Sequence, residues 1–389
     1  MAFVPVGYNV RSLLARRGTT VATALGVGLV VFVFSAVTML SDGIRKTLGS
    51  SGSPANVIVL RKGSQVELQS GITDEDARVI LDDEGLSRTE TGAALAAGEL
   101  VMVMTLPIQG GGMSNLTVRG VRDESFRLRE NVRIVEGRRF QPGTDEVIVG
   151  RATTERFEGT AIGRRVKVRA GREVTIVGVF EAKGAGVESE LWGDVDVLRA
   201  MFGRSGVYSS ITGRMRDEGA LTALEARLEA DPRLKVDVFR ETQYHEDQSD
   251  GLAKFIKILG MMVAIFFSAG AMVGAMITMY AQVAQRKREI GVLRALGFRR
   301  RVILLSFLLE SILLCVAGGA VGAAASNLLG MAKFSTTNFN TFAEVVFRFE
   351  PSTSAMVGAM VFATLMGLVG GLPPALQAAR VSPSVAMRE

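Results

Sequence analysis

The sequence predicts a membrane protein with four transmembrane α-helices and a large extracytoplasmic α+β domain. Four apolar runs, at 19–40, 258–280, 302–331 and 352–372, are each long enough to cross the hydrocarbon core of a bilayer as a helix, and only the third contains a charged residue, Glu310. Between the first two runs, the stretch 41–254 carries 34 of the 39 acidic residues and 30 of the 45 basic residues. Composition therefore separates an apolar membrane part from a part of ordinary globular composition.

Basic residues mark one set of predicted helix ends. The loop at 282–301 contains seven of them, whereas the loop at 332–351 contains only Lys333 and Arg348. Further arginines precede the first run and follow the fourth: Arg11, Arg16, Arg17, Arg380 and Arg388. The positive-inside rule therefore places both termini and the 282–301 loop in the cytoplasm, and the 41–254 domain and the 332–351 loop outside. The sequence pI of about 9.7 reflects these membrane flanks and gives no reason to expect nucleic acid.

The first apolar run has two interpretations. A cleaved signal peptide is disfavoured because the run is longer than a usual h-region and lacks a small-x-small cleavage site followed by polar sequence. We therefore expect an uncleaved anchor, preceded by a short cytoplasmic helix at 1–18. The first two membrane helices are expected to extend outward as a stalk, over 19–48 and 241–281, and the fourth to lead into a cytoplasmic tail at 373–389.

The 41–254 stretch predicts two interleaved subdomains. The first, at 49–109 and 205–240, is α/β, and the second, at 110–204, is a β-rich insertion with Gly-rich turns. In the first we expect strands at 57–60, 100–106, 207–215 and 234–239 and helices at 73–83 and 219–230, with Thr73 as the N-cap of the earlier helix. In the second we expect strands at 116–121, 146–149, 165–169 and 173–180.

Residues that support catalysis are scarce. The sequence has no P-loop and no Gly-x-Ser-x-Gly elbow, and its one histidine, His245, and one cysteine, Cys315, cannot assemble a zinc site, a Cys-His pair or a serine triad. A site made of carboxylates alone stays open. We therefore predict no catalytic site, no metal and no cofactor in this chain, and expect His245 to be a solvated stalk residue.

The segment 285–301 predicts an amphipathic helix between the second and third spans. Ile290, Val292, Leu293 and Leu296 share one arc at 100° per residue, and Gly297 stands where a helix C-cap belongs. One interpretation is a helix on the membrane surface, with its basic face toward anionic lipid head groups. The other is a helix that contacts a protein, because Glu289 falls within the apolar arc and Arg286 at its edge. Periodicity leaves both open.

Three segments carry a resemblance to a known family. The run Arg-Glu-Ile-Gly-Val-Leu-Arg-Ala-Leu-Gly at 288–297 resembles the signature of the MacB/FtsX-like (type VII) ABC transporter permeases. The C-terminal segment 374–388 resembles the family's ending, and the segments 136–140 and 174–180 resemble the MacB-type periplasmic core domain. The resemblance covers essentially the whole chain, and its parts occur in the family's order.

The resemblance implies a permease subunit without catalytic activity of its own. The α/β part would be porter-like, and the 282–301 helix would dock on a cytoplasmic ABC ATPase dimer that binds ATP and Mg²⁺. Because MacB members carry that ATPase at their N-terminus and this chain starts about 18 residues before its first span, we expect the ATPase to be a separate polypeptide. The ATPase-coupling residues would be Arg286, Arg288, Glu289, Ile290, Gly291, Leu293, Arg294 and Gly297.

The family also implies a location, partners and a mechanism. We expect a multi-pass protein of the bacterial inner membrane that pairs with a second permease subunit, in a homodimer or a heterodimer, and with a periplasmic membrane-fusion adaptor and membrane lipids. ATP hydrolysis would move the outer domains, by mechanotransmission, to export or extract an envelope substrate such as a drug, peptide or lipoprotein. The alternative is an FtsX-like signalling device that activates a cell-wall hydrolase and transports nothing.

Two features of the membrane runs have structural interpretations. Glu310 lies about 12 Å into the third span by helical rise, where we expect a structural clamp to Arg299–Arg301 or to the coupling helix rather than a proton relay. Three glycine pairs are spaced for close helix packing: Gly270/Gly274, Gly318/Gly322 and Gly367/Gly371.

The acidic, Gly-flanked segment 182–196 is predicted to be a loop. It contains Glu188, Glu190 and Trp192, the single tryptophan of the sequence. These residues either contact a substrate or a periplasmic partner or cap the β-rich part.

Overall fold

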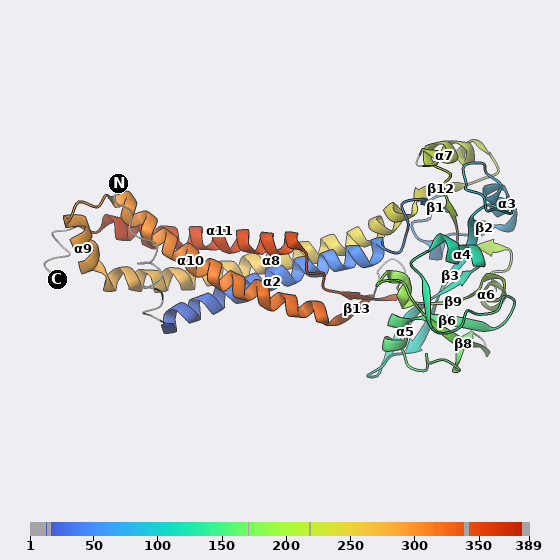
Figure 1. Ribbon diagram of the computed structural model, residues 1–389, viewed down its shortest axis with the longest axis horizontal. Helices are drawn as coiled ribbons and strands as arrows, with labels where there is room; N and C mark the ends of the chain where they lie inside the picture. The colour runs from blue at the N-terminus through green and yellow to red at the C-terminus, as the bar shows by residue number, and fades with distance from the viewer. Residues whose placement is uncertain (1–12, 14–16, 170, 218, 338–341, 383–389) are drawn as a thin grey trace. The chain divides into compact units, whose positions relative to one another are not determined.

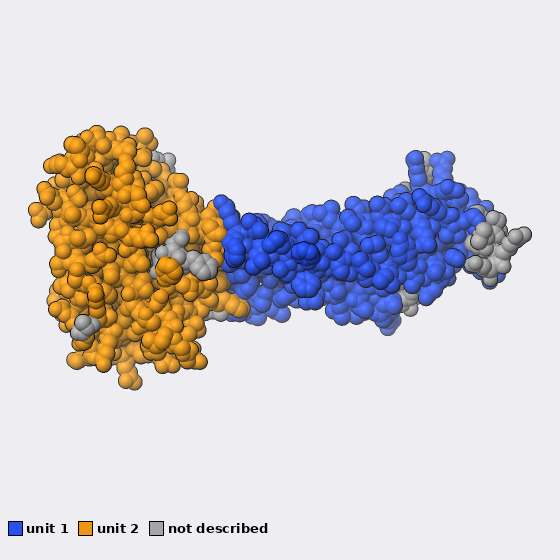
Figure 2. All heavy atoms as spheres, turned by 180° about the vertical axis from the view of Figure 1, so that it is seen from behind, with its two compact units in different colours: residues 1–42, 254–332, 348–389 blue, residues 43–253, 333–347 orange. Residues whose placement is uncertain are grey.

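The computed structural model describes residues 13, 17–169, 171–217, 219–337 and 342–382. The chain forms two compact units, coloured separately in Figure 2. The helical unit comprises Met1–Asp42, Lys254–Ala332 and Arg348–Glu389, and the α+β unit comprises Gly43–Ala253 and Lys333–Phe347. Most of the helix expected at 1–18 and the end of the tail expected at 373–389 lie outside the described residues, as do Arg11, Arg16 and Arg388.

The helical unit is built from four long helices, each with a stretch that is long and apolar enough to cross a membrane, and the prediction of four spans is confirmed. The helices are α2 (Arg17–Gly49), α8 (Glu241–Gln285), α10 (Arg300–Asn327), which the 3₁₀ turn η3 (Leu328–Met331) continues, and α11 (Thr353–Arg380) (Figure 1). A short helix, α9 (Lys287–Ala295), joins α8 to α10. The last turns of α2 and the first turns of α8 are counted with the α+β unit.

Small residues bring these helices into backbone contact. A Cβ atom at Gly322 would lie 2.1 Å from the carbonyl oxygen of Gly28 on α2, and one at Gly318 would lie 2.4 Å from that of Ala24. Gly367 and Gly371 likewise face Ile312 and Ser311 on α10, whereas among the described residues no other helix comes within 4 Å of a Cβ at Gly270 or Gly274. Two of the three predicted glycine pairs therefore pack helices of this chain against each other.

The α+β unit contains a mixed sheet of ten strands among the described residues, in the order β12-β1-β11-β3-β4-β9-β6-β8-β5, with β7 also paired to β8. The β4–β9 and β6–β8 pairs are parallel and the remaining pairs antiparallel. The strands are β1 (Asn56–Arg61), β3 (Ala96–Pro107), β4 (Met113–Val121), β5 (Arg133–Gly137), β6 (Glu146–Gly150), β7 (Arg165–Arg169), β8 (Arg172–Glu181), β9 (Glu190–Asp194), β11 (Ser210–Arg214) and β12 (Val236–Arg240).

Short elements complete this unit. Two small sheets pair β2 (Ile72–Thr73) with β10 (Val207–Tyr208) and β13 (Lys333–Thr337) with β14 (Glu344–Arg348). The helices are η1 (Glu67–Gln69), α3 (Asp74–Leu81), α4 (Asp123–Leu128), α5 (Arg151–Arg156), η2 (Gly186–Ser189), α6 (Val195–Phe202) and α7 (Ala220–Ala230). Figure 1 shows α7 beside the β12–β1 end of the sheet and α5 beside β6.

The predicted elements of this unit are confirmed, with one change in their grouping. Each expected strand and helix is present, and the Thr73 hydroxyl accepts the N–H of Asp76 as an N-cap should. The two interleaved parts, however, share one sheet, because β3 of the first part pairs along its length with β4 of the second. The boundary predicted near residue 110 is thus a hairpin turn within a common sheet.

Two predicted loops are wrong. The segment 182–196 contains η2, the strand β9 and the start of α6, and β9 lies in the middle of the sheet. Its acidic residue Glu190 conceals the strand, because a carboxylate is buried there only by pairing with an arginine from β4. The loop expected at 332–351 contains the paired strands β13 and β14, and the second begins with the acidic Glu344, which is buried there by pairing with Arg156.

We predict that Gly322→Ala destabilises the helical unit, because the new methyl group would overlap the backbone of Gly28. Overpacking of this kind costs roughly 1–3 kcal/mol, and it is measured as a lower melting temperature of the purified chain in detergent. Gly26→Ala on α2 is the matched control, since nothing lies within 4 Å of its Cβ position. Equal melting temperatures for the two variants would contradict the packing described.

Candidate functional site

The helix α9 ends as the sequence predicts. Gly297 has φ 95°, in the left-handed region that glycine adopts without strain. The N–H of Gly297 donates to the carbonyl of Arg294, and the N–H of Phe298 donates to that of Leu293. These two bonds form a Schellman motif, so the prediction that Gly297 stops the helix is confirmed.

The N-terminal end of α9 is fixed by a buried ion pair. Arg286, the N-cap residue, places Nη1 3.3 Å from Oε2 of Glu310 on α10 and Nε 3.1 Å from Oε2 of Glu289. The Arg286 and Glu310 side chains are 10% and 1% exposed, and the guanidinium also lies over the ring of Phe307. Glu310 is expected to pair either with Arg299–Arg301 or with the coupling helix. The structure shows a pair with the coupling segment, through Arg286, whereas Arg299 is exposed.

The other predicted coupling residues divide between a buried and an exposed face of α9. Ile290 and Gly291 are buried, and Ile290 packs with residues of α8, α10 and α11, among them Val283, Ile303 and Ala375. Leu293 and Arg294 are half-buried. Gly297 is exposed, and one exposed face of α9 is formed by Arg288, Glu289, Val292 and Leu296, with Val292 47% and Leu296 73% exposed. The apolar arc is thus split, and Glu289 lies on the exposed side, paired with Arg286.

A small pocket lies between α9 and α10. Arg286, Glu289, Leu293, Phe307 and Glu310 are among the residues that line it. The pocket combines charged groups with an aromatic ring beside the exposed face of α9. It is the kind of recess that a side chain of a docked protein fills.

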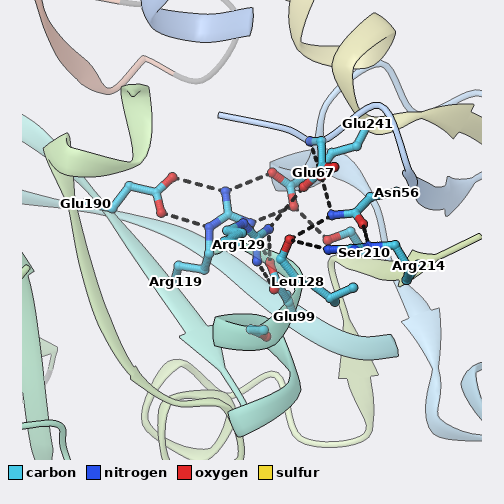
Figure 3. Close-up of polar contacts among 12 residues, drawn as sticks. Asn56, Glu67, Glu99, Arg119, Leu128, Arg129, Glu190, Ser210, Arg214 and Glu241 are labelled. Atoms are coloured by element: carbon cyan, nitrogen blue, oxygen red, sulfur yellow. Dashed lines mark hydrogen bonds and ion pairs between the residues drawn. The ribbon is translucent and has the colours of Figure 1, made fainter. Parts of the chain in front are cut away.

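The α+β unit contains a buried ion network that the sequence did not reveal. It consists of Glu67, Glu99, Arg119, Arg129, Glu190 and Glu241, which come from distant parts of the chain (Figure 3). Arg119 of β4 is at its centre: Nη1 lies 2.8 Å from Oε1 of Glu67 and 2.9 Å from Oε2 of Glu99, and Nε lies 2.8 Å from Oε2 of Glu190. One guanidinium therefore ties η1, β3 and β9 to β4.

Arg129 extends the network to the start of α8. It pairs with Glu99 and lies 3.6 Å from Glu241, the first residue of that helix. The Oε2 atom of Glu241 accepts the backbone N–H of Ser53 and the side-chain amide of Asn56, each at 2.9 Å. Glu241 thus connects α8 to the segment that leads from α2 into β1.

Burial and pairing shift the pKa values in this network in different directions. Burial alone would raise the pKa of Glu67, but the charge and hydrogen bonds of Arg119 outweigh it and lower the value to about 2. For Glu241 burial prevails over Arg129, and the pKa is raised. Burial lowers the pKa of His245 to about 4. His245 is half-buried and in edge contact with the Tyr244 ring, so the expectation of a solvated residue is wrong.

Of the three residues singled out at 182–196, Glu190 and Trp192 are buried in the α+β unit and Glu188 is half-buried. Trp192 is fully buried between Phe126 and Phe180, and its indole N–H donates to Glu190 at 2.6 Å. Glu188 accepts the backbone N–H groups of Ala182 and Gly184. This placement favours a role in holding the sheet over contact with a ligand. In the part of the chain that is described, no group of three or more His, Cys, Asp or Glu residues is placed to hold a metal ion.

Comparisons with known proteins agree with this architecture. Residues 18–231 match the MacB-like periplasmic core domain family, and residues 261–383 match the FtsX-like permease C-terminal family. A macrolide export ATP-binding/permease protein MacB of Neisseria meningitidis is 24% identical over 98% of this chain and 60% of its own length. An uncharacterized ABC transporter permease of Bacillus subtilis, YvrN, is 26% identical over 98% of this chain and 96% of its own length. The chain thus spans about 60% of the length of the MacB relative.

Two solved structures are similar to the α+β unit. The extracellular domain of the noncanonic ABC-type transporter YknZ from Gram-positive bacteria is 19% identical, with a TM-score of 0.37, over 47% of this chain and 99% of that one. The periplasmic region of MacB from Actinobacillus actinomycetemcomitans is 12% identical, with a TM-score of 0.37, over 52% of this chain and 92% of that one.

We predict that the Arg286–Glu310 pair is coupled in stability. Arg286→Met or Glu310→Met alone removes the buried counter-charge of the other residue and costs about 3 kcal/mol or more, whereas the double variant costs less than either. The melting temperatures of the wild type, the two single variants and the double variant in detergent measure this double-mutant cycle. Arg299→Met is the control, and a cycle whose effects simply add would show that the pair contributes nothing.

A second prediction concerns Glu67. At neutral pH, Glu67→Gln should destabilise the α+β unit by about 3 kcal/mol, because Arg119 loses one buried counter-charge. The folded-state pKa of about 2 lies below the ordinary 4.5, so this stabilisation is present above pH 4.5 and is lost as the pH falls toward 2. Urea unfolding of the full chain, followed by fluorescence of the single tryptophan, should show the gap between wild type and variant closing over that range.

The control for this experiment is Glu130→Gln. Glu130 also pairs with an arginine, Arg214, but its side chain is 77% exposed. Glu130→Gln should therefore change the free energy of unfolding little at any pH. A gap for Glu67→Gln that stays constant from pH 7 to pH 2 would refute the assigned pKa shift.

Proposed function

Because the chain belongs to the MacB/FtsX-like family of ABC transporter permeases, we propose that it converts ATP hydrolysis on a cytoplasmic ABC ATPase into motion of its extracytoplasmic α+β unit. The observation that carries this proposal is α9. It lies between two spans, within the FtsX-like region, and presents a mixed charged and apolar face beside a pocket. In this proposal α9 and both termini lie in the cytoplasm, and the membrane is the inner membrane of a bacterium.

The docking surface consists of Arg288, Glu289, Val292 and Leu296. Charged groups on such a surface set orientation and partner choice, and exposed aliphatic side chains supply buried area. The Arg286–Glu310 pair and the buried Ile290 fix α9 to the long helices. A push on α9 is therefore passed to α10 rather than absorbed by a flexible loop.

The long helix α8 supplies one route outward. It runs without interruption from Glu241 to Gln285, a length of about 68 Å at 1.5 Å per residue. Its first residue is held in the buried ion network, and its last lies directly before Arg286. A displacement of the α9 end is thus delivered to a fixed point in the sheet.

We further propose that the ATPase is a separate chain, that ATP and Mg²⁺ bind to it, and that the permease works as a dimer with a periplasmic adaptor. The YvrN relative, described as a permease and matched over 96% of its length, supports the first point. The cargo would be an envelope substrate such as a drug, peptide or lipoprotein. Relatives described as macrolide exporters support export. A signalling device that activates a cell-wall hydrolase is the second candidate, and it rests on the FtsX-like match.

We predict that Glu289→Ala and Gly291→Pro abolish stimulation of the copurified ATPase, the first by removing a docking charge and the second by breaking α9. The rate of ATP hydrolysis is measured for the complex in lipid nanodiscs. Lys287→Ala is the control, because it removes a charge from the same helix outside the docking surface. If the chain copurifies with no ATPase, or if both variants behave like wild type, the proposal fails.

A further inference from the structure

The loop between the last two spans is anchored on the α+β unit. We call its described residues, 333–337 and 342–347, the strap. It leaves the helical unit after η3 and returns to it just before α11, yet both of its strands belong to the α+β unit. A loop that only joined two helices needs no such anchorage.

The anchor is a buried carboxylate. Glu344 of β14 forms an ion pair with Arg156 of α5, and its side chain is only 5% exposed. Burial would raise the pKa of Glu344, but hydrogen bonds from Ser114, Ser335 and Arg156 outweigh it and lower the pKa. A charge buried this completely is tolerated only in the conformation that pairs it, so Arg156 selects one docked geometry for the strap.

Main-chain contacts continue the anchor on both sides of Glu344. The N–H of Val346 donates to the hydroxyl of Ser189 in η2 at 3.1 Å, and the side-chain amide of Asn115 in β4 donates to the carbonyl of Phe342 at 2.9 Å. Phe342 has φ 55°, a conformation that costs a non-glycine residue free energy. The strap is therefore held at three points, on α5, η2 and β4.

These points lie on a different part of the sheet from the entry of the long helices. The helices α2 and α8 connect to β1 and β12, at one end of the strand order. The strap instead holds β4 and the elements next to β6 and β9, which lie toward the other end (Figure 1). The helices α2 and α8 and the strap therefore join the same sheet at separate places. The Arg119 network links β3, β4 and β9 within that sheet.

We propose that the strap is a second force-bearing link, which passes motion of α10 and α11 to the β4–α5–η2 part of the α+β unit with Glu344 and Arg156 as its latch. The inference rests on the proposed function, since it needs ATP-driven motion of the helices. Relative motion of the two helix pairs then becomes shear within the sheet. A static brace, the competing role, would hold the unit without passing on nucleotide-dependent change.

Hydrogen exchange of the complex with its copurified ATPase, in lipid nanodiscs, tests this link. It is measured without nucleotide and after trapping with ATP and vanadate. In wild type, trapping should change exchange in both α5–η2 and β1–β12. In Glu344→Ala and Arg156→Ala, the change in α5–η2 should fall at least about tenfold, as expected for loss of a charge-assisted hydrogen bond, while ATP hydrolysis and the change in β1–β12 persist.

Two further variants distinguish loss of the Glu344–Arg156 ion pair from a folding defect. Arg156→Glu with Glu344→Arg should restore the α5–η2 response, and Glu229→Ala, which removes an exposed ion pair with Lys62, should leave it intact. A response that persists in Glu344→Ala overturns the strap alone, as does fast exchange of the Val346 amide in wild type. A variant that loses the response everywhere, or is not rescued by the charge reversal, also overturns it. No nucleotide response anywhere in the wild-type unit overturns the proposed function itself.

Discussion

The guanidinium of Arg119 is the point on which the α+β unit depends. A buried arginine has lost its hydration, and three carboxylates from η1, β3 and β9 replace that water. Without Arg119, Glu67 and Glu190 would each lose a buried counter-charge, and Glu99 would keep its pair with Arg129. The strand β9 lies in the middle of the sheet, and its Trp192 donates its indole N–H to the same Glu190 that Arg119 holds.

A buried ion pair also holds two elements together in the helical unit. Arg286 and Glu310 are buried where α9 meets α10, and their 3.3 Å contact holds the start of α9 against α10. Hydrophobic contacts alone permit sliding, since one apolar surface replaces another at little cost. A buried ion pair instead requires specific partners and a narrow geometry. In both units, charges are buried where two elements must keep a fixed relation, and glycine contacts between Gly318, Gly322 and α2 keep the remaining surfaces close.

The sequence predicted the parts of this protein that depend on local pattern. The four spans, the principal strands, the Thr73 cap and the Gly297 stop follow from hydropathy, alternation and capping chemistry, which act over a few residues. The buried ion network is invisible to such reasoning, because Glu67, Arg119 and Glu241 are far apart in the chain and look like ordinary surface charges. The same holds for β9 and β14, whose acidic residues are buried only because an arginine from elsewhere meets them. The sequence also did not predict which residues of the α9 arc are buried. Ile290 is buried and Val292 is exposed, although both side chains are apolar.

The position of the charges also has a consequence for mechanism. Glu241 closes the network at the first residue of α8, but its pKa is raised, and it is held by Ser53 and Asn56 as much as by Arg129. Its ion pair is also the longest of the network, at 3.6 Å to Arg129. The side-chain contacts of Glu241 add to a direct connection, because Arg240, the last residue of β12, is bonded to Glu241 along the chain. In the proposed mechanism, a pull along α8 therefore reaches the sheet through the backbone of β12 as well as through the contacts of Glu241.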